Sequence, residues 1–208
     1  MDRRTALILG TGAVAAMATP MSALANEEAA AEAAAPEIID YAIGAEDAPV
    51  TVIEYASFTC PHCRAFHEEV MPKLKADYIE TGKVRMIYRE VYFDGPGLWA
   101  AMVARCGGEA RYFAITDMLY EKQREWIGDG SGNAIVQNLR KIGLAAGLTA
   151  EELDQCLSDG ATAQALYDHD QANRKEYAIE GTPSLVVNGT LHGNLTYKGL
   201  KEAIDEAL

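Results

Sequence analysis

Two cysteines with two residues between them, Cys60 and Cys63, stand where a strand pattern gives way to a helix pattern. The β-branched run at 50–55 (VTVIEY) is typical of a buried strand. Pro61 suits the first position of a helix, because its missing N–H would have no partner there in any case. Cys60 then faces the free N–H groups and the positive end of the helix dipole, and both favour a thiolate. A thiol with a lowered pKa is a better leaving group, which makes the disulfide a better oxidant.

The other residues of the motif fit the same redox chemistry. His62 adds to the stabilisation of the Cys60 thiolate when it is protonated or donates a hydrogen bond. Cys63 lies one turn further into the helix and is predicted to be the buried thiol that closes the intramolecular disulfide. We expect Pro61, His62 and the two cysteines to form the catalytic group, with no cofactor.

A metal site is the alternative that the same region leaves open. His67 lies four residues after Cys63 on the same helix face, so Cys60, Cys63 and His67 could supply three ligands. A proline at the first helical position is unfavourable for a zinc knuckle, and the sequence has no second CxxC and no HxxxH to complete four ligands. We therefore expect no metal, and we expect His67 to be an ordinary, partly exposed helix residue.

Strand and helix patterns alternate on both sides of a long helical segment. The helix after the first strand has apolar residues at four-residue spacing and an expected kink at Pro72, and a second strand pattern follows at 83–92. This order predicts a βαβ unit with parallel strands. A strand at 184–187, a hairpin turn at Asn188-Gly189 and a final helix close the chain.

The segment between 97 and 177 shows no strand signal, and its apolar residues repeat with the period of helices. Glycines and polar residues at 128–133 mark a loop within it. The sequence therefore predicts an α/β core, residues 38–96 and 178–208, that is split by an all-helical insertion at 97–177.

The first residues have the features of an export signal. Paired arginines at 3–4 precede an uncharged, mostly apolar run at 5–17, and the Ala-Leu-Ala triplet at 23–25 has the pattern of a cleavage site. The run is short for a membrane span, so we expect residues 1–25 to be a cleaved signal peptide and the acidic, Ala-rich residues 26–37 to be a flexible tether. The arginine pair leaves open whether the export route is the general or the twin-arginine one. Export to the periplasm would place the cysteines in an oxidising compartment, where disulfides persist.

The remaining cysteines, Cys106 and Cys156, both fall in the predicted insertion, and neither has a Cys or His close by in the sequence. Two separate buried thiols are one interpretation. In an oxidising compartment and within one subdomain, a structural disulfide between them is favoured.

The charge balance argues against two classes of partner. The chain has 31 acidic and 18 basic residues and a formal net charge of −13. Nucleic acids and anionic membrane surfaces are bound by clustered Lys and Arg, so we expect neither as a partner.

The order of a strand, a CPHC motif at a helix start, a helical insertion, and Thr182-Pro183 before a hairpin and a final helix resembles the DsbA-type branch of the thioredoxin superfamily. The similarity extends over about residues 38–208 and implies a thioredoxin-like fold. It further implies that Pro183 is in cis and packs against the Cys60–Cys63 pair. The backbone beside Thr182 and Pro183 is then expected to bind an extended substrate segment by β-addition.

Glu54 interrupts the first apolar strand six residues before Cys60. From the strand pattern alone it could equally be an acid on an edge strand that points at solvent. The resemblance implies instead a buried acid beneath Cys63, which makes Glu54 a candidate proton acceptor for that thiol.

The resemblance also implies a function: an exported dithiol oxidase that acts as a monomer on reduced or misfolded exported proteins and is reoxidised by a quinone-linked membrane protein of the DsbB kind. An isomerase or reductase of the same superfamily is the alternative, because Thr182 stands where the best-known oxidases have valine. Isomerases of this class carry a substantial N-terminal dimerisation segment, whereas here we expect only the tether at 27–36 to precede the core. A periplasmic metal-binding module built on Cys60, Cys63 and His67 is the third hypothesis.

Overall fold

The structure is a computed structural model that describes residues 35–208. The predicted signal peptide at 1–25 and residues 26–34 of the predicted tether lie outside this part of the chain. Within 35–208, no helix is both long enough and apolar enough to cross a lipid bilayer.

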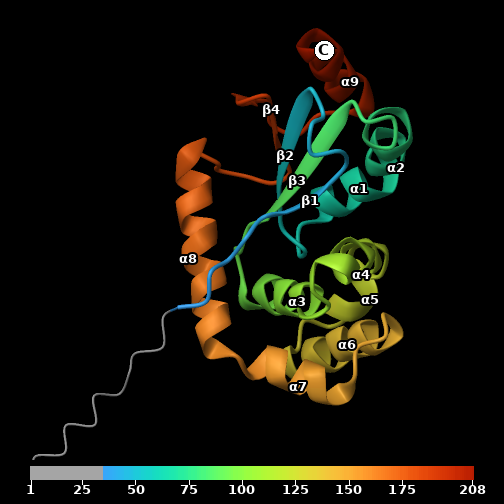
Figure 1. The fold of residues 1–208 in the computed structure, drawn as a ribbon. Helices are drawn as coiled ribbons and strands as arrows, with labels where there is room; N and C mark the ends of the chain where they lie inside the picture. The colour runs from blue at the N-terminus through green and yellow to red at the C-terminus, as the bar shows by residue number, and fades with distance from the viewer. Residues whose placement is uncertain (1–34) are drawn as a thin grey trace, which may run out of the picture. The chain divides into compact units, whose positions relative to one another are not determined.

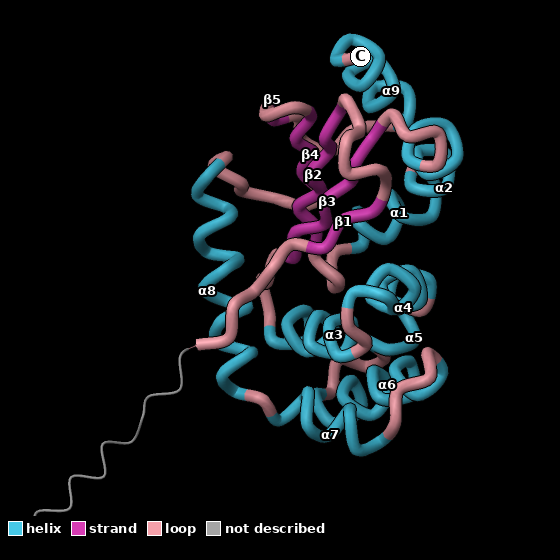
Figure 2. Tube along the Cα trace, viewed as in Figure 1, coloured by secondary structure: helices cyan, strands magenta, loops and turns pink. Residues whose placement is uncertain are grey.

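A five-stranded sheet lies at the centre of the described chain, as Figure 1 and Figure 2 show. In spatial order its strands are β1 (Tyr41–Ile43), β3 (Val84–Glu90), β2 (Val50–Ala56), β4 (Ser184–Val187) and β5 (Thr190–Leu191). β2 and β3 are parallel, which confirms the predicted βαβ unit, and the other neighbouring pairs are antiparallel. The sequence pattern does not predict β1, because three residues are too few to show an alternation.

The turn between β4 and β5 is the predicted hairpin. Asn188 and Gly189 both have positive φ angles, 43° and 84°, as a two-residue turn of this kind requires. Asparagine and glycine adopt that region at the lowest cost, which explains why this dipeptide predicts the turn correctly.

Helices cover both faces of the sheet. One face carries α1 (Pro61–Glu69), α2 (Met71–Leu74), the π-helical stretch η1 (Lys75–Ile79) and α9 (Tyr197–Ala207), and the other carries α8 (Gly160–Glu176). Alternate residues of β2 serve the two faces: Val52 packs with α1 and α9, whereas Tyr55 donates a hydrogen bond to the backbone of Asn173 in α8. Because both faces are covered, β2 is apolar at nearly every position, as a central strand must be.

The first helix of the core is broken, as a proline inside it predicts. α1 ends at Glu69 and α2 begins at Met71, with Pro72 in the first turn of α2. Pro72 has no N–H to donate to the helix before it, so the helical hydrogen bonds cannot run through this point unbroken.

Helices fill the described chain between β3 and β4: α3 (Gly95–Cys106), α4 (Glu109–Glu121), α5 (Gln123–Ile127), α6 (Gly132–Ala145), α7 (Ala150–Ser158) and α8. In Figure 1, α3 to α7 form a group below the sheet, and α8 leads from that group back to it. One buried cluster joins the two parts, since Phe58 and Cys63 of the core belong to the same cluster as Tyr120 and Trp126 of the insertion. The fold class, an α/β core with an inserted all-helical part, is therefore confirmed.

Candidate active site

Cys60 is the residue just before α1, and its backbone is extended, with φ −76° and ψ 122°. No side chain caps the start of this helix, and the backbone N–H groups of His62 and Cys63 are directed toward the Cys60 sulfur. The pKa of the Cys60 thiol is lowered to about 5, first by a hydrogen bond from the Cys63 thiol, then by Thr182 and these N–H groups, while burial opposes the shift. In the dithiol form Cys60 is therefore a thiolate at neutral pH.

Cys63 is the opposite case. Both sulfurs are free thiols, but Cys63 is fully buried on the inner side of α1. Burial raises the pKa of the Cys63 thiol, and the hydrogen bond to Cys60 and the negative charge of Glu54 raise it further. Cys60 is thus ionised and half-buried, whereas Cys63 is protonated and buried. This contrast suits a pair in which an incoming thiolate attacks Cys60 and Cys63 resolves the mixed disulfide.

The loop before β4 lies against Cys60. The Thr182–Pro183 peptide bond is cis, as the resemblance implies. The Cys60 sulfur lies 3.3 Å from the Thr182 carbonyl oxygen, to which it donates a hydrogen bond when it is protonated. The Ser184 hydroxyl donates to the Gly181 carbonyl oxygen over 2.8 Å and closes this loop. Two segments 122 residues apart in the chain thus meet at one sulfur.

His62 is exposed at the start of α1 and lines a pocket of about 530 Å³. The walls of the pocket are α1 and α2 on one side, and the segment that leads into α9 with the first residues of that helix on the other. Its lining mixes apolar with charged side chains, among them Phe66, Val70, Leu195, Tyr197, Glu69, Lys73 and Lys198. No local sequence pattern predicts this pocket, because its two walls are far apart in the chain.

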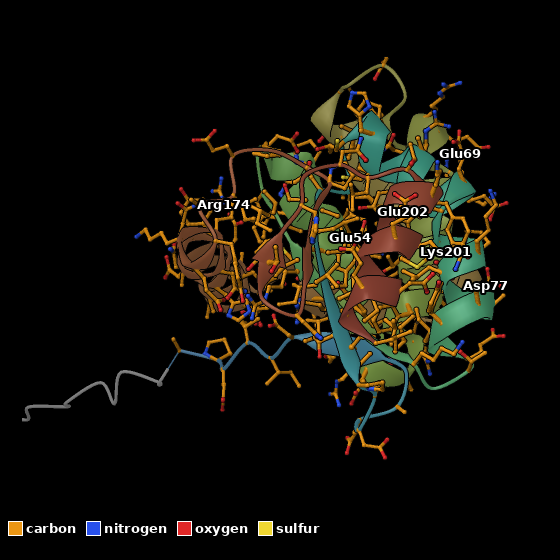
Figure 3. The ribbon with its side chains drawn as sticks, turned by 90° about the horizontal axis from the view of Figure 1, so that it is seen from above. Glu54, Glu69, Asp77, Arg174, Lys201 and Glu202 are labelled. Carbon is orange, nitrogen blue, oxygen red and sulfur yellow. A yellow bond between two sulfur atoms is a disulfide. The ribbon has the colours of Figure 1, made fainter. Side chains whose placement is uncertain are left out.

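Glu54 is fully buried in β2, opposite Tyr88 of β3 and Leu185 of β4, and lies in the interior of the molecule in Figure 3. The alternative of an edge-strand acid that faces solvent is wrong, because β2 has a paired strand on each side. The carboxylate oxygens lie 3.1 and 3.2 Å from Nε2 of His67, and the charge of Glu54 acts on Cys63. Glu54 is thus a buried acid, and its role as the proton acceptor of Cys63 stays a prediction.

His67 differs from the sequence expectation. Its side chain is only 5% exposed, since it lies between Glu54 of β2 and α4, where its ring stacks on Tyr120 with the centroids 4.1 Å apart. Nowhere in the described part of the chain do three or more His, Cys, Asp or Glu side chains come together so that they could hold a metal ion. Cys60, Cys63 and His67 are therefore not gathered into such a group, and Nε2 of His67 faces Glu54 instead.

Two further features cannot be read from local sequence. The hydroxyl groups of Tyr88 and Tyr120 lie 2.5 Å apart, and burial raises the pKa of both well above the usual value. The side-chain amide of Gln123 in α5 donates to the carbonyl oxygens of Phe58 and Cys60 over 2.8 and 2.9 Å. Both contacts cross the junction between the sheet and the insertion, so the residues that make them are distant in sequence.

Cys106 and Cys156 form a disulfide, with their Cα atoms 5.8 Å apart. The bond joins the last residue of α3 to α7, and both helices belong to the insertion. The interpretation of two separate thiols is therefore wrong, and the bond cross-links the insertion independently of the Cys60–Cys63 pair.

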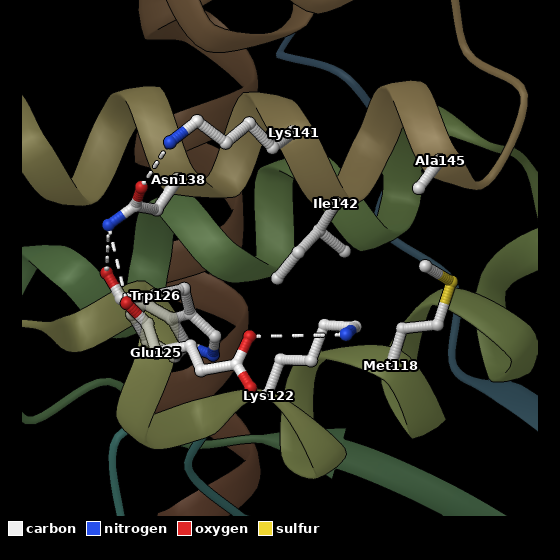
Figure 4. A pocket seen from close by; sticks show the side chains of 8 residues that line it. All are labelled: Met118, Lys122, Glu125, Trp126, Asn138, Lys141, Ile142 and Ala145. Carbon is white, nitrogen blue, oxygen red and sulfur yellow. Dashed lines mark hydrogen bonds and ion pairs between the residues drawn. The ribbon is translucent and has the colours of Figure 1, made fainter.

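A further cavity, of about 320 Å³, lies between α4, α5 and α6 (Figure 4). Its lining residues are Met118, Lys122, Glu125, Trp126, Asn138, Lys141, Ile142 and Ala145. None of the residues predicted for the site is among them, so we do not include this cavity in the candidate active site.

Comparisons with known proteins agree with this geometry. The family model described as thioredoxin matches residues 37–206. A protein of Rickettsia bellii named "Putative protein-disulfide oxidoreductase" is 34% identical over 170 residues, which make up 81% of this chain and 64% of the relative. Disulfide bond formation protein D of Bacillus subtilis is 28% identical over 177 residues, 80% of this chain and 76% of the relative. The crystal structure of alpha-DsbA1 from Wolbachia pipientis has a TM-score of 0.74 at 28% identity and covers 83% of this chain and 92% of its own.

The matched segment runs from before β1 into α9, so the likeness covers the sheet and the helical insertion as well as the CPHC motif. The Rickettsia relative is longer, and this chain spans just under two thirds of it, at 64%. The chain belongs to the thioredoxin superfamily and, within it, to the DsbA-type branch.

Proposed function

We propose that this chain is an exported thiol:disulfide oxidoreductase that introduces disulfides into other exported proteins through Cys60 and Cys63. The observation that carries the proposal is the contrast between the two sulfurs: the pKa of Cys60 is about 5, whereas burial raises that of Cys63. A stabilised Cys60 thiolate favours the dithiol form, so the disulfide form takes electrons readily from ordinary thiols. The names of the relatives in Rickettsia and Bacillus support the same reaction.

The proposed reaction has two thiol–disulfide exchanges. A substrate thiolate attacks the Cys60 sulfur of the Cys60–Cys63 disulfide, a mixed disulfide forms, and Cys63 leaves as a thiolate that takes up a proton. A second thiolate of the substrate then attacks the substrate sulfur of the mixed disulfide, and Cys60 leaves as a stable thiolate. Two electrons pass from the substrate dithiol to the Cys60–Cys63 pair, and the substrate keeps a new disulfide.

We assign Glu54 to the proton on Cys63. The carboxylate is buried, and its charge acts on the Cys63 thiol. Whenever Cys63 must become a thiolate and attack, Glu54 accepts its proton, and it returns a proton when Cys63 is released. The low pKa of Cys60 removes the need for such a partner at the other sulfur.

The substrate is proposed to lie across Cys60, between the Thr182–Pro183 loop and the pocket beside His62. An extended segment can pair with the loop backbone as an added strand. The pocket beside His62 has apolar and charged walls that would accept side chains of that segment. Backbone pairing with a mixed pocket suits a protein that serves many unfolded clients, since it demands little of their sequence.

Export to the periplasm is part of the same proposal. The bonded pair Cys106–Cys156 supports an oxidising compartment, because structural disulfides are rare in the cytosol. The predicted signal peptide at 1–25 supports export independently. Return to the disulfide form requires an electron acceptor, for which we propose a quinone-linked membrane protein of the DsbB kind, and we propose that the chain acts as a monomer.

An isomerase or reductase role is the second candidate. Thr182, whose carbonyl oxygen contacts the Cys60 thiol, is the residue that favours it. An isomerase works from its dithiol form, so it would repair a protein with wrong disulfides faster than it oxidises a reduced one.

The test mixes the disulfide form of the full chain with a reduced peptide that holds two cysteines and follows peptide oxidation. We expect one peptide disulfide per Cys60–Cys63 disulfide, none with Cys60→Ser, and the wild-type rate with the control His192→Gln. The same chain in its dithiol form is then given a protein with wrong disulfides. Rapid repair without rapid peptide oxidation would overturn the oxidase assignment in favour of the isomerase.

A further inference from the structure

Glu54 has no direct route for a proton to and from solvent. Its side chain is fully buried in the central strand β2, beneath α1. Unless the carboxyl keeps the proton of Cys63 throughout the disulfide state, it must exchange that proton with water between the two halves of the cycle. Among the described residues, the hydrogen-bond partner of the carboxylate is His67, whose Nε2 lies 3.1 and 3.2 Å from its two oxygens.

The His67 ring is in contact with two tyrosine rings and with the Glu54 carboxylate. Its ring stacks on Tyr120 with 24° between the planes, and its edge meets Tyr88 with the centroids 5.9 Å apart. Nε2 faces Glu54, whereas Nδ1 is buried and has no hydrogen-bond partner among the described residues. The His67 side chain is only 5% exposed, so its unpaired Nδ1 lacks a hydrogen bond that it would make in water. A buried polar atom without a partner calls for an explanation.

A cavity of about 360 Å³ adjoins this histidine. Its walls come from α1, α2, η1 and α4, and His67 and Tyr120 are among the residues that line it. At roughly 30 Å³ for each water molecule the cavity has room for several. It is separate from the pocket beside His62, which lies between α1 and the segment before α9.

Charged side chains surround the outer end of this cavity. Lys75 of η1 and Asp117 of α4 form an ion pair over 2.8 Å, Glu68 of α1 is paired with Arg64 over 2.9 Å, and Glu121 of α4 is exposed beside them. The other titratable groups near the His67 ring are Glu54, Cys63, Tyr88 and Tyr120, of which Tyr120 also lines the cavity. The ring thus stands between a buried carboxylate and a polar, charged opening, where a proton can pass to water.

We propose that His67 carries the proton between Glu54 and the solvent in this cavity. The proposal rests on the exchange reaction assigned to Cys60 and Cys63 and adds the route of its proton. When the pair closes to a disulfide, the Cys63 proton passes to Glu54 and the Cys63 thiolate attacks the mixed disulfide at Cys60. The ring takes the proton from Glu54 at Nε2 and releases the one on Nδ1 to water. When substrate is oxidised, Cys63 is released and the same transfers run in reverse, which restores the ring.

As a consequence, the substrate and the proton use different sides of the site. Substrate approaches Cys60 from the side of the Thr182–Pro183 loop, whereas the proton of Cys63 leaves on the side of α4. A bound substrate that covers Cys60 therefore does not block proton exchange.

The experiment measures how fast Cys63 closes the disulfide on a Cys60–glutathione mixed disulfide. We expect His67→Ala and His67→Gln to slow closure at neutral pH by roughly 100-fold, the lower range for general acid–base catalysis. Gln retains an amide where Nε2 contacts Glu54 but cannot pass a proton on, so it separates the relay from the hydrogen bond. His192→Gln is the matched control outside the site and should close at the wild-type rate.

Added imidazole provides the second readout. In His67→Ala it should enter the cavity and restore closure in a saturable manner, with no effect on the wild type. Closure of His67→Gln at the wild-type rate, or no recovery of His67→Ala with imidazole, would overturn the relay. A third measurement uses the wild-type protein and so does not depend on the folding of a variant. Its closure rate should be lower in deuterated water than in ordinary water, and equal rates in the two solvents would contradict the proposal. Because glutathione supplies the disulfide, these rates are measured whether or not the chain oxidises peptides, so the two proposals fail separately.

Discussion

Two identical side chains, Cys60 and Cys63, acquire opposite properties from surroundings that differ over one helical turn. Cys60 is half-buried at the open end of α1 and collects hydrogen bonds that favour its thiolate. Cys63 is enclosed and faces the charge of Glu54, which disfavours its thiolate. The difference in pKa between the two sulfurs is therefore a property of the fold, and it makes the reaction directional.

The first prediction concerns the pH dependence of Cys60. Because its pKa is lowered to about 5, the thiolate fraction rises as the pH increases through that value and is nearly complete well before neutral pH. The rate of alkylation of the dithiol form should follow this curve, with Cys63 unreactive over the same range. A midpoint near 9.0, the ordinary value, would show that the fold does not stabilise the thiolate.

The second prediction concerns Glu54. Glu54→Gln keeps the volume and a hydrogen bond to His67 but removes the proton acceptor, so disulfide closure by Cys63 should slow by roughly 100-fold. Alkylation of Cys60, which does not use this acid, should keep most of its rate. Glu206→Gln, on the exposed side of α9, is the control, and a wild-type closure rate in Glu54→Gln would exclude the acceptor role.

The residues of the site could be predicted where their chemistry depends on residues that are close together in the sequence. Cys60, Pro61 and Cys63 follow from their spacing at a helix start, and Pro183 from the resemblance. His67 was misjudged because its burial depends on α4, a helix of the insertion that no sequence pattern places against α1. Gln123 was missed for the same reason, since its partners lie across the junction.

Among the elements, the short helix α5 fixes the backbone of the segment that carries Cys60. Its Gln123 holds two carbonyl oxygens of the segment that carries Cys60 into α1, at Phe58 and at Cys60 itself. The amide is buried, so no water substitutes for these bonds without rearrangement. The insertion therefore sets the geometry of the redox motif as well as covering it.

The third prediction follows from this contact. Gln123→Ala leaves two carbonyl oxygens without their donor and should lower the free energy of unfolding by about 1–3 kcal/mol. Gln137→Ala, at an exposed position of α6, should change it by less than about 0.5 kcal/mol. Urea unfolding of both variants measures the difference, and equal stability of the two would show that the Gln123 contact contributes nothing.

The elements themselves were largely predictable from their periodicity. β2 and β4 have β-branched, buried runs, and β3 alternates between buried and partly exposed residues. α1 shows both its apolar stripe and its proline break. The unpredicted strand β1 is short and exists because it pairs with the edge of β3. Such an element depends on the sheet that it joins, so its own residues carry little signal.

On the scale of the whole molecule, a sheet-based core and a helical insertion share one buried cluster directly behind the redox motif. The Cys106–Cys156 bond ties α3 to α7 within the insertion. Its place in the chain predicts a contribution to stability, because it closes a long loop of the unfolded state.

The fourth prediction tests whether the Cys106–Cys156 bond contributes to stability and not to the exchange reaction. The double variant Cys106→Ala/Cys156→Ala should lose about 2–4 kcal/mol of stability, measured by thermal or urea unfolding. Its peptide oxidation rate should stay within about a factor of two of wild type, since neither residue contacts Cys60 or Cys63. A variant that folds fully but oxidises no peptide would show that this bond takes part in the reaction.

We propose that the fold makes the Cys60–Cys63 disulfide a strong oxidant. The direct measurement is the equilibrium of the full chain with reduced and oxidised glutathione, with the fraction of dithiol read by alkylation. We expect a reduction potential far more positive than that of thioredoxin, which is about −270 mV. A potential as low as that of thioredoxin would contradict it.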